Sequence, residues 1–562
     1  MTRRALPATG AVALLSIWIA LVGNLALWRR LISLGVLAGP SGWLLAFAMF
    51  AIIGALVSGL LSLVTWPGVF KPAAIGLLLV VAFAGHFMLS YGVVMDPGML
   101  TNAMQTDAHE LQGLLNWRLG VAVIAVAALP GAILLRQPIS FQPVRRQLAR
   151  NALLLVSALV LTVAMAVASF QSLAALMRNH KDVRYLINPL ASLYSLGRVA
   201  AKPWQRADGK LIAVGTDAHV SELAATGQRP TLLLLVLGET ARSDHLGING
   251  YDRDTMPTLA RSDVVSFRNA WACGTSTAAS VPCMFSHLPR EQFEARKNQY
   301  EGLLDVLQHA GLAVLWLDNQ SGCKGVCDRV PHLDTTASND SSHCAGGDCL
   351  DGVMLEGLDA RIGALDPTRV RRGLVIVMHQ MGSHGPAYHR RSPASVKRFV
   401  PECTTSALAD CSRESVVNAY DNSILYTDKF LGEAIAWLKD RASVADTAMV
   451  YVSDHGESLG ENNIYLHGLP YVIAPDAQKH VPWITWASEA YQRNKRLSMS
   501  CLRGVADTRL SHDNYFHSVL GLMKVKSSYY DPAMDFYAKC RLGSEDSFAM
   551  GGAIAPLVGR GM

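Results

Sequence analysis

The sequence predicts an α-helical membrane part with five transmembrane spans, followed by an α/β domain outside the cytoplasm whose central sheet is mostly parallel. Three observations lead to this fold class. The 562-residue chain is 51% hydrophobic and 17% charged, whereas soluble globular proteins are roughly 25% charged. Five apolar segments open the chain, and from about residue 228 to 540 short apolar runs alternate with helix-like stretches. That alternation is typical of parallel strands joined by helices.

The apolar segments lie near residues 11–27, 43–65, 73–95, 118–135 and 152–170. Each is close to the ~20 residues that a spanning helix needs. A signal peptide would account only for the first segment, and no clear A-x-A cleavage site ends it. Buried helices of a soluble core would carry a polar face, which these segments almost entirely lack. We therefore expect five spans.

Basic residues predict the orientation of these spans. If the N-terminus is cytoplasmic, the outside loops hold mainly Arg29 and Arg30, and the inside segments hold Arg3, Arg4, Lys71, Arg136, Arg145, Arg146 and Arg150. Lys and Arg are concentrated on the cytoplasmic side of membrane proteins. The chain after about residue 170 is thus predicted to lie outside the cytoplasm.

We expect a transmembrane domain at residues 1–170, a bridge at 171–227, the α/β domain at 228–541 and a disordered tail at 542–562, rich in Gly, Ala and Ser. Within the bridge, Met177–Val199 mixes basic and apolar residues. This pattern suits a short amphipathic helix on the membrane surface, and a plain interdomain linker is an equal alternative. In the α/β domain, Tyr300–Ala310 and Val416–Lys439 are predicted helices.

All ten cysteines follow residue 270. An even number in close spacing favours disulfides in an oxidising compartment, which agrees with the predicted orientation. Zinc binding is the alternative, but the single C-x3-C has no matching second pair. The sequence does not fix the connectivity, and pairing of sequence neighbours is the simplest: 273–283, 323–327, 344–349, 403–411 and 501–540.

The formal charge of +6 is modest for this length. It is no nucleic-acid signature. An anionic surface such as lipid headgroups, or ordinary solvated charge, explains it about equally well.

Three apolar runs end on residues that bind metals. Thr231–Thr240 ends on Glu239, Gly373–Met378 runs into His379 and then His384, and Ala448–Val452 runs into Asp454 and His455. In open α/β sheets the ligand crevice lies at the carboxyl ends of the strands. We therefore expect these side chains to meet there.

The expected metal ligands are carboxylates and imidazoles: Glu239, Asp454, His455 and His467, with His384. Zinc takes about four such ligands, and oxygen-rich sites also suit manganese or magnesium. Each histidine taken alone is more often a structural residue. Their joint placement at several strand ends favours a metal site.

A candidate nucleophile lies in Cys273–Ala278 (CGTSTA), a glycine-bearing turn rich in small hydroxyl residues and followed by Ser280–Cys283. A hydroxyl at a helix start lies where the helix favours an anionic group. A neighbouring metal would lower its pKa and make it a nucleophile. The alternative is an ordinary helix N-cap.

A polar stripe, Asn102, Thr106 and Glu110, lies in the predicted outside loop between the third and fourth spans. The spacing of four places the three residues on one helix face. This face could hold a lipid headgroup, or it could simply be solvated.

These motifs resemble those of the phosphoethanolamine transferases that modify lipid A, a family that includes the mobile colistin-resistance enzymes. The resemblance covers nearly the whole chain and implies an alkaline-phosphatase-like periplasmic domain. The matching segments are LGET (237–240), CGTSTAASVPCMFS (273–286), DNQSGCKGVCDR (318–329), HQMGSHGP (379–386), SDHGESLGE (453–461), YLHGLPY (465–471) and SHDNYFHSVLGL (511–522).

The resemblance implies a role for each matching residue. Thr277, the second threonine of its motif, is the implied nucleophile. It would hold catalytic zinc with Glu239, Asp454 and His455. His384 and His467 would bind the phosphoryl group or a second zinc. The implied substrate side comprises Asn319, Ser321, Lys324 and His379, and the implied donor-lipid contacts are Asn102, Thr106 and Glu110.

The implied reaction transfers phosphoethanolamine from phosphatidylethanolamine to a phosphate of lipid A, through a covalent intermediate on Thr277. The protein would be a monomeric, multi-pass protein of the bacterial inner membrane that gives resistance to polymyxins. The alternatives are a manganese-dependent glycerol-phosphate transferase of the lipoteichoic acid synthase type, transfer to a core sugar, and a non-catalytic lipid-binding scaffold. A sulfatase is disfavoured because no C-x-P-x-R segment occurs.

Overall fold

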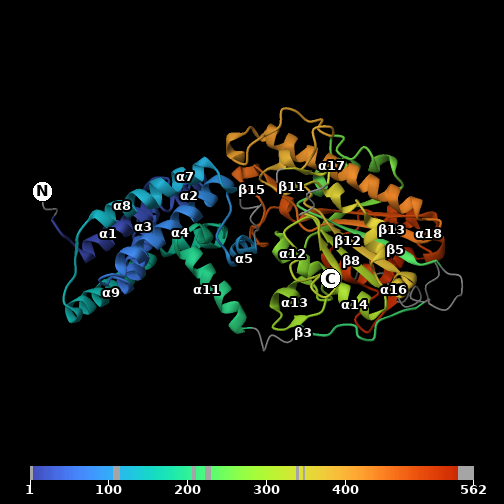
Figure 1. Ribbon diagram of the computed structural model, residues 1–562. Helices are drawn as coiled ribbons and strands as arrows, with labels where there is room; N and C mark the ends of the chain where they lie inside the picture. Colours follow the sequence, from blue (N-terminus) through green and yellow to red (C-terminus); the bar gives the residue numbers. More distant parts are fainter. Residues whose placement is uncertain are drawn as a thin grey trace, which may run out of the picture.

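The computed structural model describes residues 4–105, 114–205, 211–221, 229–336, 341–345 and 348–541. An N-terminal helical part lies beside an α/β part, and α5 (Pro97–Gln105) lies where the two meet (Figure 1). Thr106, Glu110 and the tail after residue 541 are outside the described residues.

Four described helices are long and apolar enough to cross a membrane: α3 (Gly39–Leu63), α4 (Phe70–Tyr91), Trp117–Arg136 and α9 (Val144–Ala168). The third of these comprises α7 (Trp117–Val123), a π-helical turn (Ile124–Ala128) and α8 (Leu129–Arg136). The shorter α1 (Ala8–Leu21) and α2 (Leu25–Ser33) pass the same test only together and are bent by 41°. The helical part therefore offers four to five apolar spans.

The bend between α1 and α2 has a packing cause. A Cβ on Gly23 would lie 2.6 Å from Val81 Cγ1, so glycine lets the chain approach α4 closely. Asn188 fixes this break from outside: its Nδ2 donates to Gly23 O at 3.1 Å and to Val81 O at 2.9 Å.

The segment Met177–Val199, predicted as a short amphipathic helix or a plain linker, does not form one continuous helix. The structure has α10 (Phe170–Asn179), a 3₁₀ turn (Val183–Leu186) and α11 (Leu190–Gln205) there instead. The residue before a proline is disfavoured in a helix, and Asn188 precedes Pro189 just before α11. The backbone N–H of Asn188 also donates to Asn24 Oδ1 at 2.9 Å, so the break lies against the bundle.

An eight-stranded sheet forms the centre of the α/β part, in the order β17-β6-β16-β13-β5-β12-β8-β9. The strands are β17 (Leu510–Ser511), β6 (Val264–Trp271), β16 (His480–Ala487), β13 (Asp446–Ser453), β5 (Thr231–Gly238), β12 (Leu374–His379), β8 (Ala313–Asp318) and β9 (His332–Asp334). Only β16 runs against the others. The sheet is therefore mostly parallel, as predicted.

Helices cover both faces of this sheet. Alternate residues of β5 point to opposite faces. Leu233 and Leu235 pack with α14 (Leu303–His309) and α20 (Tyr515–Leu522). Leu232 and Leu234 pack with α17 (Arg413–Asp440), the long helix above the sheet in Figure 1. With both faces apolar, the polar residues of the central strands gather at the carboxyl edge.

Shorter elements complete the fold. The helices are α12 (Thr277–Met284), α13 (Arg290–Ala295), α15 (Leu358–Gly363), α16 (Pro367–Arg372), α18 (Glu489–Lys495) and α19 (Met499–Gly504). The strand pairs are β1/β2 (Leu6–Pro7, Ile139–Ser140), β3/β7 (Leu211–Ile212, Gln299–Tyr300), β4/β18 (His219–Val220, Val525–Lys526), β10/β11 (Cys344–Ala345, Asp348–Cys349) and β14/β15 (Ser458–Leu459, Tyr465–Leu466).

Five disulfides join the cysteines: 273–283, 323–327, 344–349, 403–411 and 501–540. These are the neighbour pairs expected from the sequence. Cys323 and Cys327 are joined to each other, so they do not offer the free thiolates that zinc would need.

Candidate active site

The three strands singled out in the sequence lie next to one another, with β5 between β12 and β13. Their registers align the strand ends, since His379 is paired with Leu237 and Ser453 with Gly238. Glu239 and Asp454, the next residues along their strands, are thereby brought side by side at the carboxyl edge.

Glu239, Asp454 and His455 form one buried cluster. Their ligand atoms all lie within 4.8 Å of one another. His455 Nε2 is 3.3 Å from Glu239 Oε1 and 3.4 Å from Asp454 Oδ2, and all three side chains are fully buried. The predicted convergence of these three residues is thus present in the structure.

Thr277 is the first residue of α12 and its hydroxyl enters this cluster. Thr277 Oγ1 donates to Glu239 Oε2 at 3.0 Å and lies 3.4 Å from His455 Nε2. Thr275, the other threonine of the motif, instead donates to Leu469 O at 2.6 Å. The hydrogen bonds therefore show that Thr277, and not Thr275, contacts the cluster. The sequence spacing alone did not distinguish the two threonines.

The pKa values of the three cluster residues are shifted far from their usual values. Burial and the charge of Glu239 raise the pKa of Asp454 to about 7. Burial alone would lower the pKa of His455, but Asp454 and Glu239 raise it to about 10. Burial opposes a low pKa at Glu239 too, yet its hydrogen bond with His455 and the charges of nearby histidines hold that pKa below its usual range. Two buried carboxylates therefore depend on one proton held at His455.

A divalent cation fits this arrangement better than the proton does. Glu239 Oε1 and Asp454 Oδ2 are buried, and among the described residues they make no hydrogen bond beyond the ion pairs with His455 Nε2 at 3.3 and 3.4 Å. His455 Nδ1 donates to Gly456 O at 2.9 Å, which leaves the Nε2 lone pair free for a metal. Two carboxylates, one imidazole and a hydroxyl are a donor set that zinc accepts.

Comparisons with known proteins show which family the chain is similar to. A family model described as Phosphoethanolamine transferase EptA/EptB matches residues 53–203, and one described as Sulfatase matches residues 231–525. Phosphoethanolamine transferase EptA of Salmonella typhimurium is 39% identical over 554 residues, covering 96% of this chain and 98% of that protein.

The chain belongs to the EptA family of phosphoethanolamine transferases. Phosphatidylethanolamine transferase Mcr-1 of Escherichia coli is 36% identical over 93% of this chain and 96% of its own length. The integral membrane lipooligosaccharide phosphoethanolamine transferase A (EptA) from Neisseria meningitidis has a similar structure, with a TM-score of 0.90 at 32% identity, covering 96% of this chain and 100% of that one.

In this EptA-family chain, two further histidines flank the cluster. The rings of His455 and His467 are 4.3 Å apart, and those of His467 and His384 are 5.4 Å apart. His467 Nδ1 lies 3.2 Å from Glu457 Oε1, and burial lowers the pKa of His467. His467 thus lies between contacts with His455 and His384, and these three histidines are called the imidazole row.

His512 organises the cluster from behind and was missed as a single residue by sequence reasoning. Its Nε2 donates to Ser453 O at 3.0 Å, and its Nδ1 accepts the backbone N–H of Cys273 at 3.1 Å. Burial lowers its pKa to about 3, so it stays neutral. It thereby joins the end of β13 to the turn that leads to Thr277. The only sequence signal was its place in the SHDNYFHSVLGL motif.

Gln320 was also missed, although its neighbours were predicted. Its Nε2 donates to Glu239 Oε2 at 3.1 Å. Lys324 Nζ donates to Ser321 Oγ at 2.7 Å. Asn319, predicted on the substrate side, is instead fully buried, and its amide donates to Cys349 O at 3.0 Å and to Asp351 Oδ1 at 2.9 Å.

His379 ends β12 and is fully buried. Its Nδ1 lies 3.0 Å from Asp318 Oδ2, and this carboxylate also accepts from Trp316 Nε1 at 2.8 Å. Burial by itself would raise the pKa of Asp318, but the charge and hydrogen bond of His379 hold it at about 2. The structure thus places His379 in a charged pair with a residue that sequence reasoning did not select.

A cavity of about 420 Å³ connects the site with the helical part of this EptA-family chain. Its lining includes His384 and His467 from the α/β part, Asn102 from α5, and Phe83 and Phe87 from α4. The end of α4 also contacts the α/β part, since Tyr91 donates to Ser406 O at 3.2 Å. Of the predicted polar stripe, Asn102 borders this cavity.

Proposed function

We propose that this protein is a zinc-dependent enzyme that transfers phosphoethanolamine from phosphatidylethanolamine to a phosphate of lipid A, by way of a covalent intermediate on Thr277. One observation carries the proposal: the Thr277 hydroxyl contacts Glu239 Oε2 and His455 Nε2 within the cluster that holds the unsatisfied oxygens Glu239 Oε1 and Asp454 Oδ2. The relatives named as transferases of phosphoethanolamine or phosphatidylethanolamine support the choice of the transferred group.

The proposal includes a membrane arrangement. The chain is an inner-membrane protein with a cytoplasmic N-terminus and five spans in residues 1–170, counting α1 and α2 as one broken span. Residues 171–227 connect this domain to a periplasmic catalytic domain at 228–541. The ten disulfide-bonded cysteines support an oxidising compartment for that domain. It acts as a monomer.

The donor lipid binds in the cavity beside α4. Its acyl chains lie along the apolar residues Phe83 and Phe87, and its headgroup reaches His384 and His467. Asn102, Thr106 and Glu110 are proposed headgroup contacts, with Ser321, Lys324 and His379 on the substrate side. An apolar cavity with a few polar groups at one end suits such an amphipathic ligand.

The reaction has two steps. In the first, Thr277 Oγ1 bonds to the phosphorus of the donor, and the bond from phosphorus to the diacylglycerol oxygen breaks. Glu239 Oε2 orients the hydroxyl by accepting its hydrogen bond, and a proton passes to the departing diacylglycerol. In the second, an oxygen of a lipid A phosphate bonds to the same phosphorus, the bond from phosphorus to Thr277 Oγ1 breaks, and the proton of the attacking phosphate hydroxyl passes to Thr277 Oγ1.

Zinc bound by Glu239, Asp454, His455 and Thr277 would lower the pKa of the hydroxyl and offset charge on the phosphoryl oxygens. His384 and His467, at the end of the imidazole row, would donate hydrogen bonds to the other phosphoryl oxygens. The product carries an added ammonium group, which reduces the negative charge of lipid A and weakens the binding of cationic peptides such as polymyxins.

The test compares lipid A from cells that produce the wild-type protein with lipid A from cells that produce Thr277→Ala at equal level. Mass spectrometry should find phosphoethanolamine-modified lipid A only with the wild type. Unchanged modification in the variant would reject Thr277 as the nucleophile. The mass of the adduct trapped on Thr277 decides the donor group, because a phosphoglycerol adduct would favour the lipoteichoic acid synthase type of reaction.

A further inference from the structure

Asp351 is a buried carboxylate that accepts four hydrogen bonds from two different loops. Its Oδ1 accepts from Asn319 Nδ2 at 2.9 Å and from Met381 N at 2.8 Å. Its Oδ2 accepts from Gln380 Nε2 at 3.2 Å and from Gly382 N at 3.1 Å. Asn319 follows β8, whereas the other three donors follow β12. Asp351 therefore ties together the loops that leave two neighbouring strands.

Both loops hold Glu239. From the loop after β8, Gln320 Nε2 donates to Glu239 Oε2 at 3.1 Å. From the loop after β12, Ser383 N donates to Glu239 O at 3.1 Å. A Cβ on Gly382 would lie 2.8 Å from that same carbonyl oxygen, so the loop passes directly over the Glu239 backbone. One loop thus fixes the side chain of Glu239, and the other fixes its backbone.

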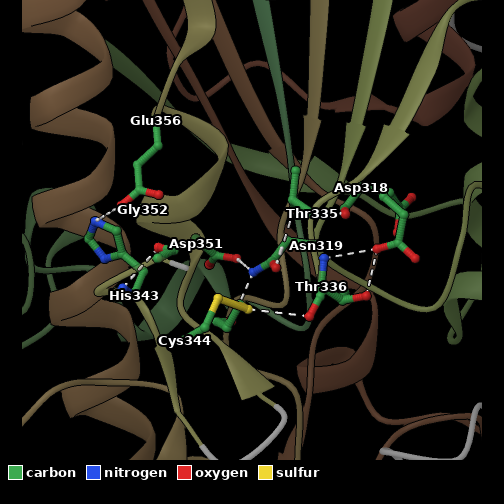
Figure 2. The surroundings of a disulfide bond; sticks show 12 residues. Asp318, Asn319, Thr335, Thr336, His343, Cys344, Asp351, Gly352 and Glu356 are labelled. Carbon is green, nitrogen blue, oxygen red and sulfur yellow. Dashed lines mark hydrogen bonds and ion pairs between the residues drawn. A yellow bond between two sulfur atoms is a disulfide. The ribbon is translucent and has the colours of Figure 1, made fainter. Parts of the chain in front are cut away.

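Asp351 is itself held by the hairpin β10/β11, which the Cys344–Cys349 disulfide closes. The amide of Asn319 donates to Cys349 O as well as to Asp351. Figure 2 shows the side chains of Asn319 and Asp351 directed toward each other beside this disulfide. Asp351 therefore follows closely after a hairpin whose two strands are joined by a disulfide, which limits its movement.

We propose that Asp351 is a positioning residue for the metal site. By holding the two loops together, Asp351 fixes the position of Gln320. Gln320 in turn orients the Glu239 carboxylate, with Oε2 toward Thr277 and Oε1 toward the metal. The inference rests on the proposed zinc site. Residues outside the ligand sphere that orient a ligand typically contribute 10–100-fold to metal affinity or activity.

The first variant is Asp351→Asn in the full-length protein. An amide group in place of one carboxylate oxygen points hydrogens at N–H donors, so two of the four hydrogen bonds are lost. We expect zinc affinity, measured by competition with a chelator, to fall about 10–100-fold. We expect kcat to fall with it, while the KM for phosphatidylethanolamine changes less than about twofold.

The matched control is Asp428→Asn. Asp428 is also a buried carboxylate that ties down a loop, since it accepts the backbone N–H groups of Thr258 and Leu259 at 2.8 Å each. These partners lie outside the metal cluster. Asp428→Asn should lower the thermal unfolding midpoint as Asp351→Asn does but leave zinc affinity unchanged. Equal zinc affinity in wild type, Asp428→Asn and Asp351→Asn would overturn the proposal.

A second variant, Gln320→Met, keeps the inference testable even if Asp351→Asn does not fold. It leaves Asp351 and its four donors in place and removes the link to Glu239. Zinc affinity should fall about 10-fold or more with an unchanged unfolding midpoint, and wild-type affinity would reject the proposal. The double variant should lose no more affinity than Asp351→Asn alone, because the two residues act along one path; additive losses would contradict this. If the wild type itself binds no zinc, the proposed function fails instead.

Discussion

Helix α9 and strand β5 are both almost entirely apolar, yet they lie in opposite environments. All eight residues of β5 are buried inside the protein. In α9 only 11% of the apolar window is buried, and Leu153, Val160 and Val167 are 66%, 62% and 71% exposed. The 25 residues of α9 are enough for the ~30 Å hydrocarbon core of a bilayer, whereas β5 is far too short. An apolar segment is therefore expected to be shielded from water. Its length indicates whether the protein core or the lipid bilayer provides that shielding.

The contrast between β5 and α9 extends to the effect of placing polar residues there. At the carboxyl edge of β5, Glu239 is buried and accepts hydrogen bonds from Thr277 and Gln320. On α9, exposed residues such as Val160 are apolar, and we expect a bilayer to surround them. Substitutions at the two places should therefore differ in size and in what they disrupt, and the following predictions test that difference in order of expected effect.

Glu239→Gln should have the largest effect. It removes one negative charge from the metal cluster and the strong acceptor of the Thr277 hydroxyl. We expect the transfer rate to fall about 10³-fold or more, with loss of bound zinc measured by mass spectrometry of the intact protein. Glu461→Gln is the control, because Glu461 pairs with Arg242 at 2.7 Å and not with the cluster. Bound zinc and transfer at wild-type level in Glu239→Gln would refute the metal site.

Asp318→Asn should come next and lower the free energy of unfolding by about 3–5 kcal/mol. It removes the carboxylate that pairs with the buried His379 and leaves that imidazole without its opposite charge. Burial opposes a raised pKa at His379, but Asp318 raises it above 6.5. The depressed pKa of Asp318 stabilises the fold above pH 3.8, and this contribution is lost as the pH falls through about 2. The raised pKa of His379 stabilises it below 6.5, and this is lost as the pH rises through that raised value.

The difference between wild type and Asp318→Asn should therefore be largest between about pH 4 and 6.5 and shrink on both sides. Unfolding midpoints across this range provide the measurement. Asp507→Asn breaks an ion pair with Arg268 in which both side chains are largely exposed to solvent. Solvent screens such pairs, so the pH dependence of this control should be much smaller. A difference that does not vary with pH would show that the pair is not charged.

Removing the Cys501–Cys540 disulfide by Cys501→Ser with Cys540→Ser should destabilise the α/β part by about 2–5 kcal/mol. Removing Cys403–Cys411 should cost less, because the sequence separation is 8 instead of 39 residues. Limited proteolysis during heating should show fragments of the α/β part at lower temperature while the helical part stays intact. Equal sensitivity of both parts would contradict this separation.

Val160→Arg should cost about 2.5–3.5 kcal/mol and act on the insertion of α9, with no effect on the metal cluster. The charge would face lipid in the middle of the helix. The fraction of protein extracted from membranes only by detergent should fall, and the Val160→Ala control should match the wild type. A protein that inserts normally with this charge would show that Val160 does not face the bilayer.

The sequence alone located the parts of the site that depend on local pattern. Glu239, Asp454 and His455 could be found because each follows a fully apolar strand, and parallel strands bring their ends together. Asn188, Gln320 and Asp351 could not, because each acts through partners in other loops or helices. Thr277 could be preferred to Thr275 only through the family resemblance, since both are small hydroxyl residues in one turn.

The predicted spans were close in position but not in detail. The apolar composition of a segment does not predict the bend at Gly23, because that bend depends on contact with Val81 in another helix. The segment Met177–Val199 is interrupted where Asn188 precedes Pro189, and the partners of Asn188 hold this break against the bundle.

The cavity between α4 and the row of histidines has a kinetic consequence. A donor that enters it from the side never has to leave the bilayer, so its encounter with the enzyme is diffusion in two dimensions. Turnover should then follow the mole fraction of phosphatidylethanolamine in the membrane, and diluting that lipid with an inert phospholipid should slow the enzyme even when the total amount of donor in the sample is held constant.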